Sequence, residues 1–343
     1  MRSLSLLALS STLTACLSAT PYQTDDLNIA EVAGGICDFI GDATTLYIYA
    51  CQGGIFSCPM TGCSSPKKLA STDKNVAALA VDDDSVYWLP TSIGGSIMRA
   101  PKTGGEGTVM WPGSSPATGG EFCGIAVDAG YVYWTNCDPT GAANGLWRIA
   151  KQGGSTSYVA FPHFSGMAPR ILVDADWIYW VSQPTLSAQS SLCRISTDPA
   201  AAAAATCSSD TFASNVPNNE SSWYRRGLTE DADSVYWVSG WADGAIHRTA
   251  KSDLSALPMA IPPTSTSTFG PMAVDDTHLY WLEILRPVTN SGAGSARLRR
   301  ADKQGAGGTT TVTNAVDARG FVLRAGSYVY WSMNDRIFGR LVE

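Results

Sequence analysis

Charge is scarce in this chain: Lys, Arg, Asp and Glu make up 15% of its 343 residues, and the net charge is −7. No run of basic residues provides the positive surface with which proteins bind nucleic acid. The sequence has only three histidines, and it has no Cys-x-x-Cys pair, GxSxG elbow, HExxH motif or GxxxxGK[ST] phosphate loop. We therefore expect no nucleic-acid partner, no bound metal and no cofactor, and we lean away from an enzyme.

Long apolar runs are also missing, since no segment approaches the eighteen consecutive apolar residues of a membrane-spanning helix. The Leu-rich stretch 4–13 follows Arg2 and is too short to cross a bilayer, which is typical of a signal peptide. The letters Leu13-Thr14-Ala15-Cys16 then resemble the bacterial lipobox. This resemblance predicts a signal peptide over residues 1–15 and a lipidated tether over residues 16–26. An ordinary secretory signal with a chance cysteine is the alternative.

The expected location follows from the lipobox. Acyl chains on Cys16 would hold the mature protein at a membrane. Leu17, where some lipoproteins have Asp, favours the outer membrane by resemblance to the bacterial sorting rule. The expected partners are therefore the membrane, through Cys16, and a further binding partner for a monomeric domain.

Eight of the nine cysteines remain once Cys16 is set aside, an even number that suits disulfides in an oxidising compartment. Two pairs flank a tyrosine at the same offsets, so their members face each other across a hairpin. The other two pairs each close a later hairpin. The predicted disulfides are Cys37–Cys51, Cys123–Cys137, Cys58–Cys63 and Cys193–Cys207. Metal binding is the rival interpretation, but the spacings do not converge on one site.

One unit recurs seven times, marked by a tyrosine that is followed in six copies by tryptophan: Tyr47-Ile48, Tyr87-Trp88, Tyr133-Trp134, Tyr179-Trp180, Tyr236-Trp237, Tyr280-Trp281 and Tyr330-Trp331. An acid stands five residues before six of these tyrosines: Asp42, Asp82, Asp128, Asp174, Asp231 and Asp275. The seventh copy has Ala325 there. A period of roughly 40–50 residues is typical of a propeller blade.

Each copy continues into a second pair of arms with the consensus I-x-R-x-x-K and Gly-rich turns, as in SIMRAPKTGG (96–105) and LWRIAKQGG (146–154). Four short strands per copy, without helices, predict an all-β fold: a seven-bladed β-propeller of four-stranded antiparallel blades. A tandem array of small domains is disfavoured, because a lone four-stranded sheet would leave its apolar faces uncovered.

The repeated residues are expected to build the fold. Each tryptophan packs between blades, and each aspartate caps the amides of a turn. Six acids spread around a ring cannot form one acid–base pair. The last copy stops after its third strand at 335–341, so we expect residues 27–32 to supply the missing outer strand and close the ring over 27–343.

The Val-Tyr-Trp repeats resemble the YWTD β-propellers of the low-density lipoprotein receptor group and related bacterial exported propellers. The resemblance covers about residues 35–343. It departs from that group after the aromatic pair, where only Tyr133-Trp134-Thr135-Asn136 comes close, and in having seven units where the receptors have six. What the resemblance implies for function is binding or scaffolding without catalysis.

Function on a propeller is expected at the end where the connections vary, here 136–145, 182–191, 214–227 and 283–296. Residues just before the inner strands are the candidate ligand-binding positions, with SSWYRRG (221–227) the most suggestive because aromatics beside arginines are typical of recognition surfaces. These candidates are Glu121, Phe122, Arg170, Trp223, Tyr224, Arg225, Arg226, Phe269 and Arg319.

The leading hypothesis is a lipid-anchored exported propeller that binds a protein, peptide or glycan through its loop face. The alternative is a metal-dependent hydrolase or lyase that resembles propeller lactonases or streptogramin lyases. Its nearest metal ligands would be Asp38, Asn75 and Glu121, although arginines at equivalent positions would oppose a cation. A purely structural element of an envelope assembly is a third possibility.

Overall fold

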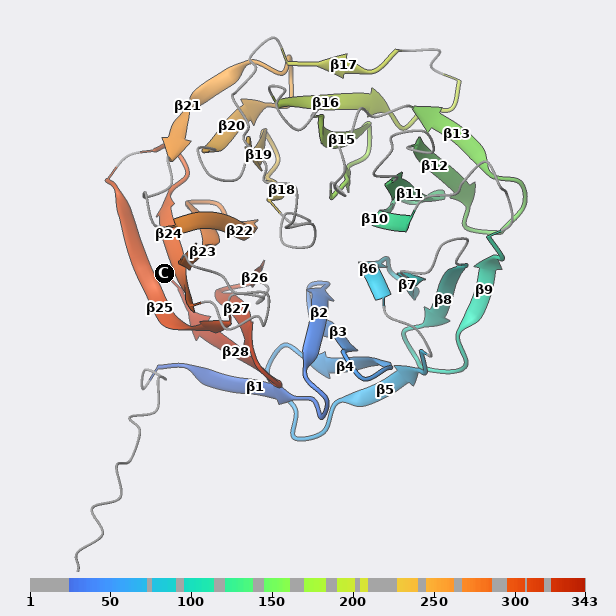
Figure 1. Cartoon of the computed structure of the whole chain (residues 1–343), viewed down its shortest axis with the longest axis horizontal. Helices are drawn as coiled ribbons and strands as arrows, with labels where there is room; N and C mark the ends of the chain where they lie inside the picture. The colour runs from blue at the N-terminus through green and yellow to red at the C-terminus, as the bar shows by residue number, and fades with distance from the viewer. Residues whose placement is uncertain are drawn as a thin grey trace, which may run out of the picture.

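In a computed structural model of the chain, strands radiate around a central axis (Figure 1). The structure describes residues 25–72, 76–90, 96–113, 121–137, 145–160, 170–182, 190–200, 204–208, 227–239, 245–261, 267–285, 295–305, 307–317 and 322–342. Over these residues, 28 strands form seven four-stranded antiparallel sheets and no helix occurs. The described part of the chain has no helix that could cross a membrane. The predicted seven-bladed β-propeller is confirmed.

Each sheet is one blade, and its strands A to D run from the centre to the rim (Figure 1). The first blade consists of β2 (Ile36–Gly41), β3 (Thr45–Ala50), β4 (Ile55–Pro59) and β5 (Lys67–Ala70). The second consists of β6 (Val76–Val81), β7 (Ser85–Pro90), β8 (Ile97–Pro101) and β9 (Thr108–Trp111). The third consists of β10 (Glu121–Val127), β11 (Tyr131–Cys137), β12 (Gly145–Ala150) and β13 (Ser157–Ala160).

The remaining blades follow the same order. The fourth consists of β14 (Leu172–Val173), β15 (Trp177–Ser182), β16 (Ser191–Ser196) and β17 (Thr206–Cys207). The fifth consists of β18 (Leu228–Glu230), β19 (Ser234–Val238), β20 (Ile246–Ala250) and β21 (Ala256–Ile261). The sixth consists of β22 (Ser267–Val274), β23 (His278–Leu285), β24 (Ser295–Asp302) and β25 (Thr309–Asp317). The seventh consists of β26 (Val322–Ala325), β27 (Tyr328–Met333), β28 (Arg336–Leu341) and β1 (Leu27–Glu31).

The core lies between neighbouring blades. Successive side chains of a strand point to opposite faces, so the tyrosine of one strand B meets the valine and tryptophan of the next blade. Between the second and third blades, Tyr87 packs with Val132 and Trp134. Between the third and fourth, Tyr133 packs with Ile178 and Trp180. The repeated aromatics are therefore blade-to-blade packing, as predicted, and six of the eleven tryptophans are buried there.

The N-terminal strand closes the ring, as predicted. Strand β1 pairs antiparallel with β28 and brings Leu27 opposite Gly339 and Glu31 opposite Arg336. Ile29 is 3% exposed and packs in the cluster that joins the seventh blade to the first. A Cβ atom on Gly339 would lie 3.1 Å from the Ile29 side chain, so glycine at this position lets β1 approach closely.

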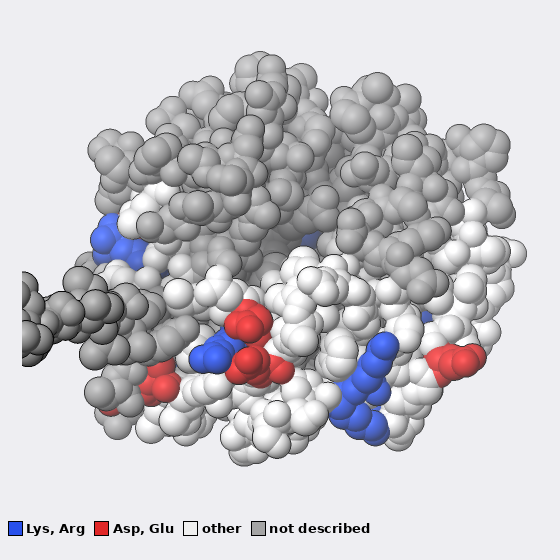
Figure 2. Space-filling model, turned by 60° about the horizontal axis from the view of Figure 1, so that its bottom comes forward, with Lys and Arg blue, Asp and Glu red and all other residues white. Residues whose placement is uncertain are grey.

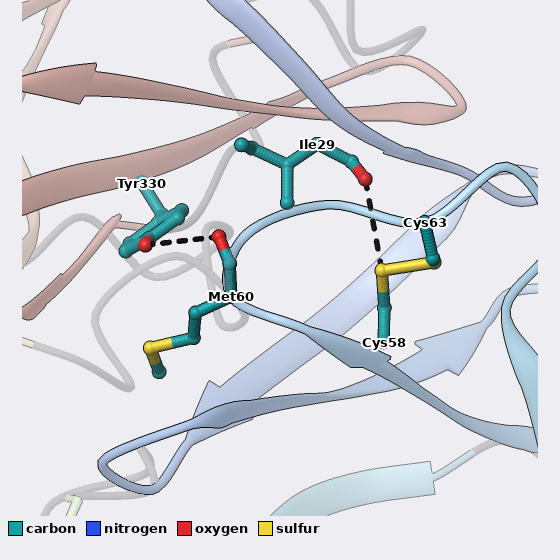
Figure 3. The surroundings of a disulfide bond; sticks show 5 residues. All are labelled: Ile29, Cys58, Met60, Cys63 and Tyr330. Atoms are coloured by element: carbon teal, nitrogen blue, oxygen red, sulfur yellow. Dashed lines mark hydrogen bonds between the residues drawn. A yellow bond between two sulfur atoms is a disulfide. The ribbon is translucent and has the colours of Figure 1, made fainter.

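A disulfide lies beside this closure (Figure 3). Cys58 and Cys63 are bonded in the first blade, and the Sγ atom of Cys58 lies 3.6 Å from the carbonyl oxygen of Ile29. The amide of Cys63 donates to the same carbonyl. The disulfide thus closes the turn of the first blade whose two cysteines contact the strand that completes the seventh blade.

Three of the four predicted disulfides are present: Cys37–Cys51, Cys58–Cys63 and Cys193–Cys207. The side chains of the fourth pair lie outside the described residues. Its backbone repeats that of the first pair, since the register shifts at Cys123 between Phe122 and Gly124 as it does at Cys37. The bond between Cys123 and Cys137 therefore stays a prediction.

Candidate functional site

The repeated aspartates occupy the three-residue turns between strands A and B. In the second blade, the Oδ1 atom of Asp82 accepts the backbone N–H groups of Asp84 and Ser85 at 2.9 and 2.8 Å. The Oδ2 atom accepts the hydroxyl of Tyr87 at 2.9 Å. Burial and the Asp82 carboxylate raise the pKa of Tyr87 to about 12, so this hydroxyl remains a donor. The turn-capping role predicted for the acid is confirmed, and the same tyrosine bond recurs at Asp42, Asp128, Asp231 and Asp275.

A cation from the next blade reaches the same carboxylate, and sequence reasoning missed this contact. The lysine of the I-x-R-x-x-K consensus directly follows strand C and points back toward the preceding blade. Among the described residues, five of the seven blade junctions carry such an ion pair: Lys102–Asp42 (2.8 Å), Lys151–Asp82 (2.6 Å), Lys251–Asp174 (3.1 Å), Lys303–Asp231 (2.9 Å) and Arg324–Asp275 (2.8 Å). We call this ion pair between neighbouring blades a clamp. The lysine that recurs in the consensus was the sequence signal for it.

The sixth junction uses a different cation. Val342 stands where other blades have the lysine, and Arg324 of strand A donates to Asp275 in its place. Burial raises the pKa of Asp275, but the amides of His278 and Thr277 and the Arg324 guanidinium outweigh it and lower that pKa to about 2. The junction therefore keeps a charged pair although the repeat has lost its lysine.

At the junction of the seventh and first blades, where the ring closes, both the acid and the lysine of the ion pair are replaced. Ala325 stands in place of the acid, and Met60 of the first blade stands in place of the lysine. The hydroxyl of Tyr330, which has no aspartate in its turn, donates to the carbonyl oxygen of Met60 at 3.2 Å (Figure 3). This junction is apolar, so it needs no charge compensation.

The fourth and fifth blades share a larger ionic network. Lys251 lies 3.1 Å from Asp174 and 2.9 Å from Glu230, which replaces the apolar residue found before the turn acid in most blades. Burial raises the pKa of Glu230, with Lys251 opposing that shift. Burial lowers the pKa of Arg170, one of the predicted ligand-binding residues, and the charge of Glu230 opposes that shift.

Two further predicted ligand-binding residues are packed between blades. Phe122 is 2% exposed and lies edge-on to Trp111, with ring centroids 6.2 Å apart. Phe269 is 4% exposed and lies edge-on to Trp281 at 6.3 Å. Packing accounts for both rings. The side chain of Glu121 is outside the described residues, as are Asn75, Trp223, Tyr224, Arg225, Arg226 and Arg319.

None of the His, Cys, Asp and Glu side chains of the described residues form a group of three or more that could hold a metal ion. Asp38 is 4% exposed. His247 is buried with its ring 4.8 Å from that of Trp237, and burial lowers its pKa to about 4. His278 lies at the start of β23 beside Thr277, and His163 is outside the described residues.

The described residues on the face seen in Figure 2 include few charged ones. On the face seen in Figure 2, acidic and basic side chains are scattered among neutral ones and form no broad field of one sign. The described part of this face therefore presents no extended basic surface of the kind that binds nucleic acid.

Comparisons with known proteins support the fold. No protein-family model matches the chain. No curated protein matches its sequence. Among solved structures, the WD40 repeats of RRP9 cover 94% of this chain and 99% of that chain, with a TM-score of 0.61 and 9% identity. YCF48 bound to a D1 peptide covers 95% and 97%, with a TM-score of 0.55 and 11% identity.

A nidogen/laminin complex aligns more weakly, over 64% of this chain and 76% of that chain, with a TM-score of 0.45 and 14% identity. That likeness is too low to support a relationship with the YWTD group. What the comparisons establish is that the chain is similar in fold to β-propellers, two of them built from WD40 repeats.

Proposed function

We propose that this chain is an exported, lipid-anchored β-propeller that binds a protein or peptide at the end of the ring formed by the B–C and D–A connections, here called the loop end. The propeller fold is consistent with a protein-binding scaffold, and one similar structure is YCF48 bound to a peptide. The opposite end, formed by the A–B and C–D turns, is here called the turn end.

The observation that carries this proposal is the contrast between the two ends. At the turn end, six A–B connections have three residues each, such as 42–44 between β2 and β3, and the seventh has two. At the loop end, the B–C connections range from two residues (334–335) to nine (286–294), and the D–A connections from four (32–35) to twenty (208–227). The A–B turns, which are almost constant in length, serve construction, whereas connections that vary around a rigid scaffold are where binding surfaces are found.

The export and anchoring part of the proposal rests on Cys16 and on the disulfides. Three disulfides are consistent with an oxidising compartment outside the cytoplasm. Strand β1 lies on the outer rim of the ring (Figure 1), and ten residues separate Cys16 from Leu27. A lipid on Cys16 would therefore hold the propeller by its rim, close to the membrane, with both ends of the ring open to partners.

Site-specific photo-crosslinking in the native envelope tests the proposed binding end. A p-benzoylphenylalanine at Trp223 places the probe in the D–A connection with the most suggestive sequence. The same probe at Tyr158, which is 50% exposed on the outer strand β13, is the matched control. We expect a defined protein adduct from position 223 that is lost in an Arg225→Ala background, and none from position 158. No adduct at 223, or the same adducts at both positions, would contradict the proposal.

A further inference from the structure

The junction between the third and fourth blades departs from the others in one respect: it keeps the turn acid but not the cation. Asp128 makes the usual bonds within its own blade. Its Oδ1 atom accepts the amides of Gly130 and Tyr131 at 2.7 Å each, and its Oδ2 atom accepts the hydroxyl of Tyr133 at 2.7 Å. Among the described residues, Asp128 forms no ion pair with a Lys or Arg side chain.

Thr197 occupies the place of the lysine. Its amide donates to the carbonyl of Asp176 at 2.9 Å, as the amide of Lys151 donates to Gly130 at the same distance in the preceding blade. Its carbonyl accepts Arg148 at 3.3 Å, as that of Lys151 accepts Arg99 at 3.0 Å. The backbone is therefore in the repeated position. Only the side chain differs, and the Thr197 hydroxyl turns to the carbonyl of Ala175 at 3.0 Å.

A cavity of about 640 Å³ lies at this junction, at the turn end between the third and fourth blades. Its walls are the A–B turns 128–131 and 175–177 and the end of strand C at 196–198. Three carboxylates line it, those of Asp128, Asp176 and Asp198, and no lysine or arginine does. The volume is within the range of small-ligand sites.

Two arginines that lie over aromatic rings of this cavity already have partners. The Arg148 guanidinium lies 4.9 Å from the ring centroid of Tyr131, and its Nη1 atom donates to Thr197 as described. The Arg194 guanidinium lies 4.0 Å from the ring centroid of Trp177 and donates to the carbonyls of Lys251 and Ser252 in the fifth blade. Neither arginine forms an ion pair with the carboxylate of Asp128.

At the junction of the seventh and first blades, both the acid and the lysine are replaced, so no carboxylate is left without a cation there. At Asp128 only the cation is replaced, while four other turn acids hold a lysine ammonium and a fifth holds an arginine. The repeat itself therefore identifies the chemistry that fits the Oδ2 side of this carboxylate: a primary ammonium on an alkyl chain.

We propose that the cavity between the third and fourth blades binds the side chain of a lysine residue presented by a partner protein, with its ammonium group on Asp128. The methylene chain of that lysine would lie along Tyr131 and Trp177, and Asp176 and Asp198 favour a partner that carries positive charge around the lysine. This site is at the turn end, so it is separate from the loop-end surface and does not depend on it.

Calorimetric titration with n-butylammonium chloride, a mimic of the lysine side chain, at constant ionic strength tests the site. We expect one bound ion per chain and no binding of n-butanol, which has the same chain without the charge. A peptide Ac-Gly-Lys-Gly-NH2 should bind, and its Nε-acetyl form should not. Equal heats for butylammonium and butanol, or displacement of butylammonium by calcium but not by the lysine peptide, would overturn the proposal.

Two variants localise the binding. Thr197→Lys restores the repeat and places the protein's own ammonium on Asp128, so it should weaken butylammonium binding by about tenfold or more while the protein stays folded. Asp128→Asn should weaken it similarly. Asp82→Asn, at a junction that already holds Lys151, is the matched control and should leave binding unchanged. Unaltered binding to Thr197→Lys would contradict the assignment.

Discussion

The side-chain nitrogen of Lys151 lies 2.6 Å from a carboxylate oxygen of Asp82, although the two residues belong to neighbouring blades. Both side chains are largely buried, with 17% and 14% of their surface exposed. Lys151→Thr copies the residue that the fourth blade has at this place. It should lower the free energy of unfolding by about 1–2 kcal/mol, because a partly buried carboxylate loses its cation. Denaturant titration measures the change.

The control for that variant is Lys68→Thr, which removes an exposed lysine from an outer strand. It should change the free energy of unfolding by no more than about 0.5 kcal/mol. Equal effects of the two substitutions would show that the clamp between blades contributes nothing to stability.

The aspartates of the A–B turns predict how the free energy of unfolding depends on pH. Burial raises their pKa values, but hydrogen bonds and the clamp cations outweigh it, so the pKa values of Asp42, Asp82, Asp174, Asp231 and Asp275 lie below the usual 3.8. A carboxyl group with a lowered folded pKa stabilises the fold above its unfolded pKa and loses that contribution as the pH falls through the folded value. The free energy of unfolding should therefore fall between about pH 4 and pH 2. A flat profile over this window would contradict the role of the clamps.

His247 predicts a separate effect at higher pH. Burial lowers its pKa from 6.5 to about 4, so the folded protein holds the neutral ring while the unfolded chain takes up a proton. The contribution of His247 to stability is present above about pH 6.5 and is lost as the pH falls toward 4. The stability profile of His247→Gln should be flatter over this interval than that of the unmodified protein, and identical profiles would place the histidine in a solvated environment.

The fourth disulfide can be tested by peptide mapping without reduction. Cys37 and Cys123 stand at the same register shift in equivalent strands, so a Cys123–Cys137 peptide should appear beside the other three pairs. Each of the two equivalent bonds closes a loop of about 15 residues and should contribute about 3 kcal/mol by the loop-entropy estimate. Free thiols at Cys123 and Cys137 in the oxidised protein would contradict this pairing.

Much of the fold could be predicted because each blade repeats the same local physics. An acid before a Val-Tyr-Trp strand specifies both a capped turn and an inter-blade aromatic, and six copies make the pattern unmistakable. The missing outer strand of the last blade likewise required a partner, and β1 was the one strand-like segment left. The repeated sequence pattern was therefore enough to predict the architecture and the disulfide pairs.

The clamps and the cavity could not be predicted in the same way, because they depend on which turn lies beside which. Lys102 and Asp42 are 60 residues apart and meet only when two blades pack. Phe122 and Phe269 lie near the starts of the inner strands β10 and β22, where a sequence cannot distinguish a side chain at the channel mouth from one between blades. Thr197 is informative only after the structure shows what the equivalent lysines do.

The closed ring is tested most directly by comparing two substitutions on β1, the strand that completes the seventh blade. Ile29 is 3% exposed and packs in the core that joins the first and seventh blades, whereas Leu27, two residues away, is 50% exposed. The measurement is the free energy of unfolding of Ile29→Ala and Leu27→Ala. Closure predicts a loss of about 2–4 kcal/mol for Ile29→Ala and no more than about 0.5 kcal/mol for Leu27→Ala. Equal and small losses at both positions would contradict a ring closed by its N-terminal strand.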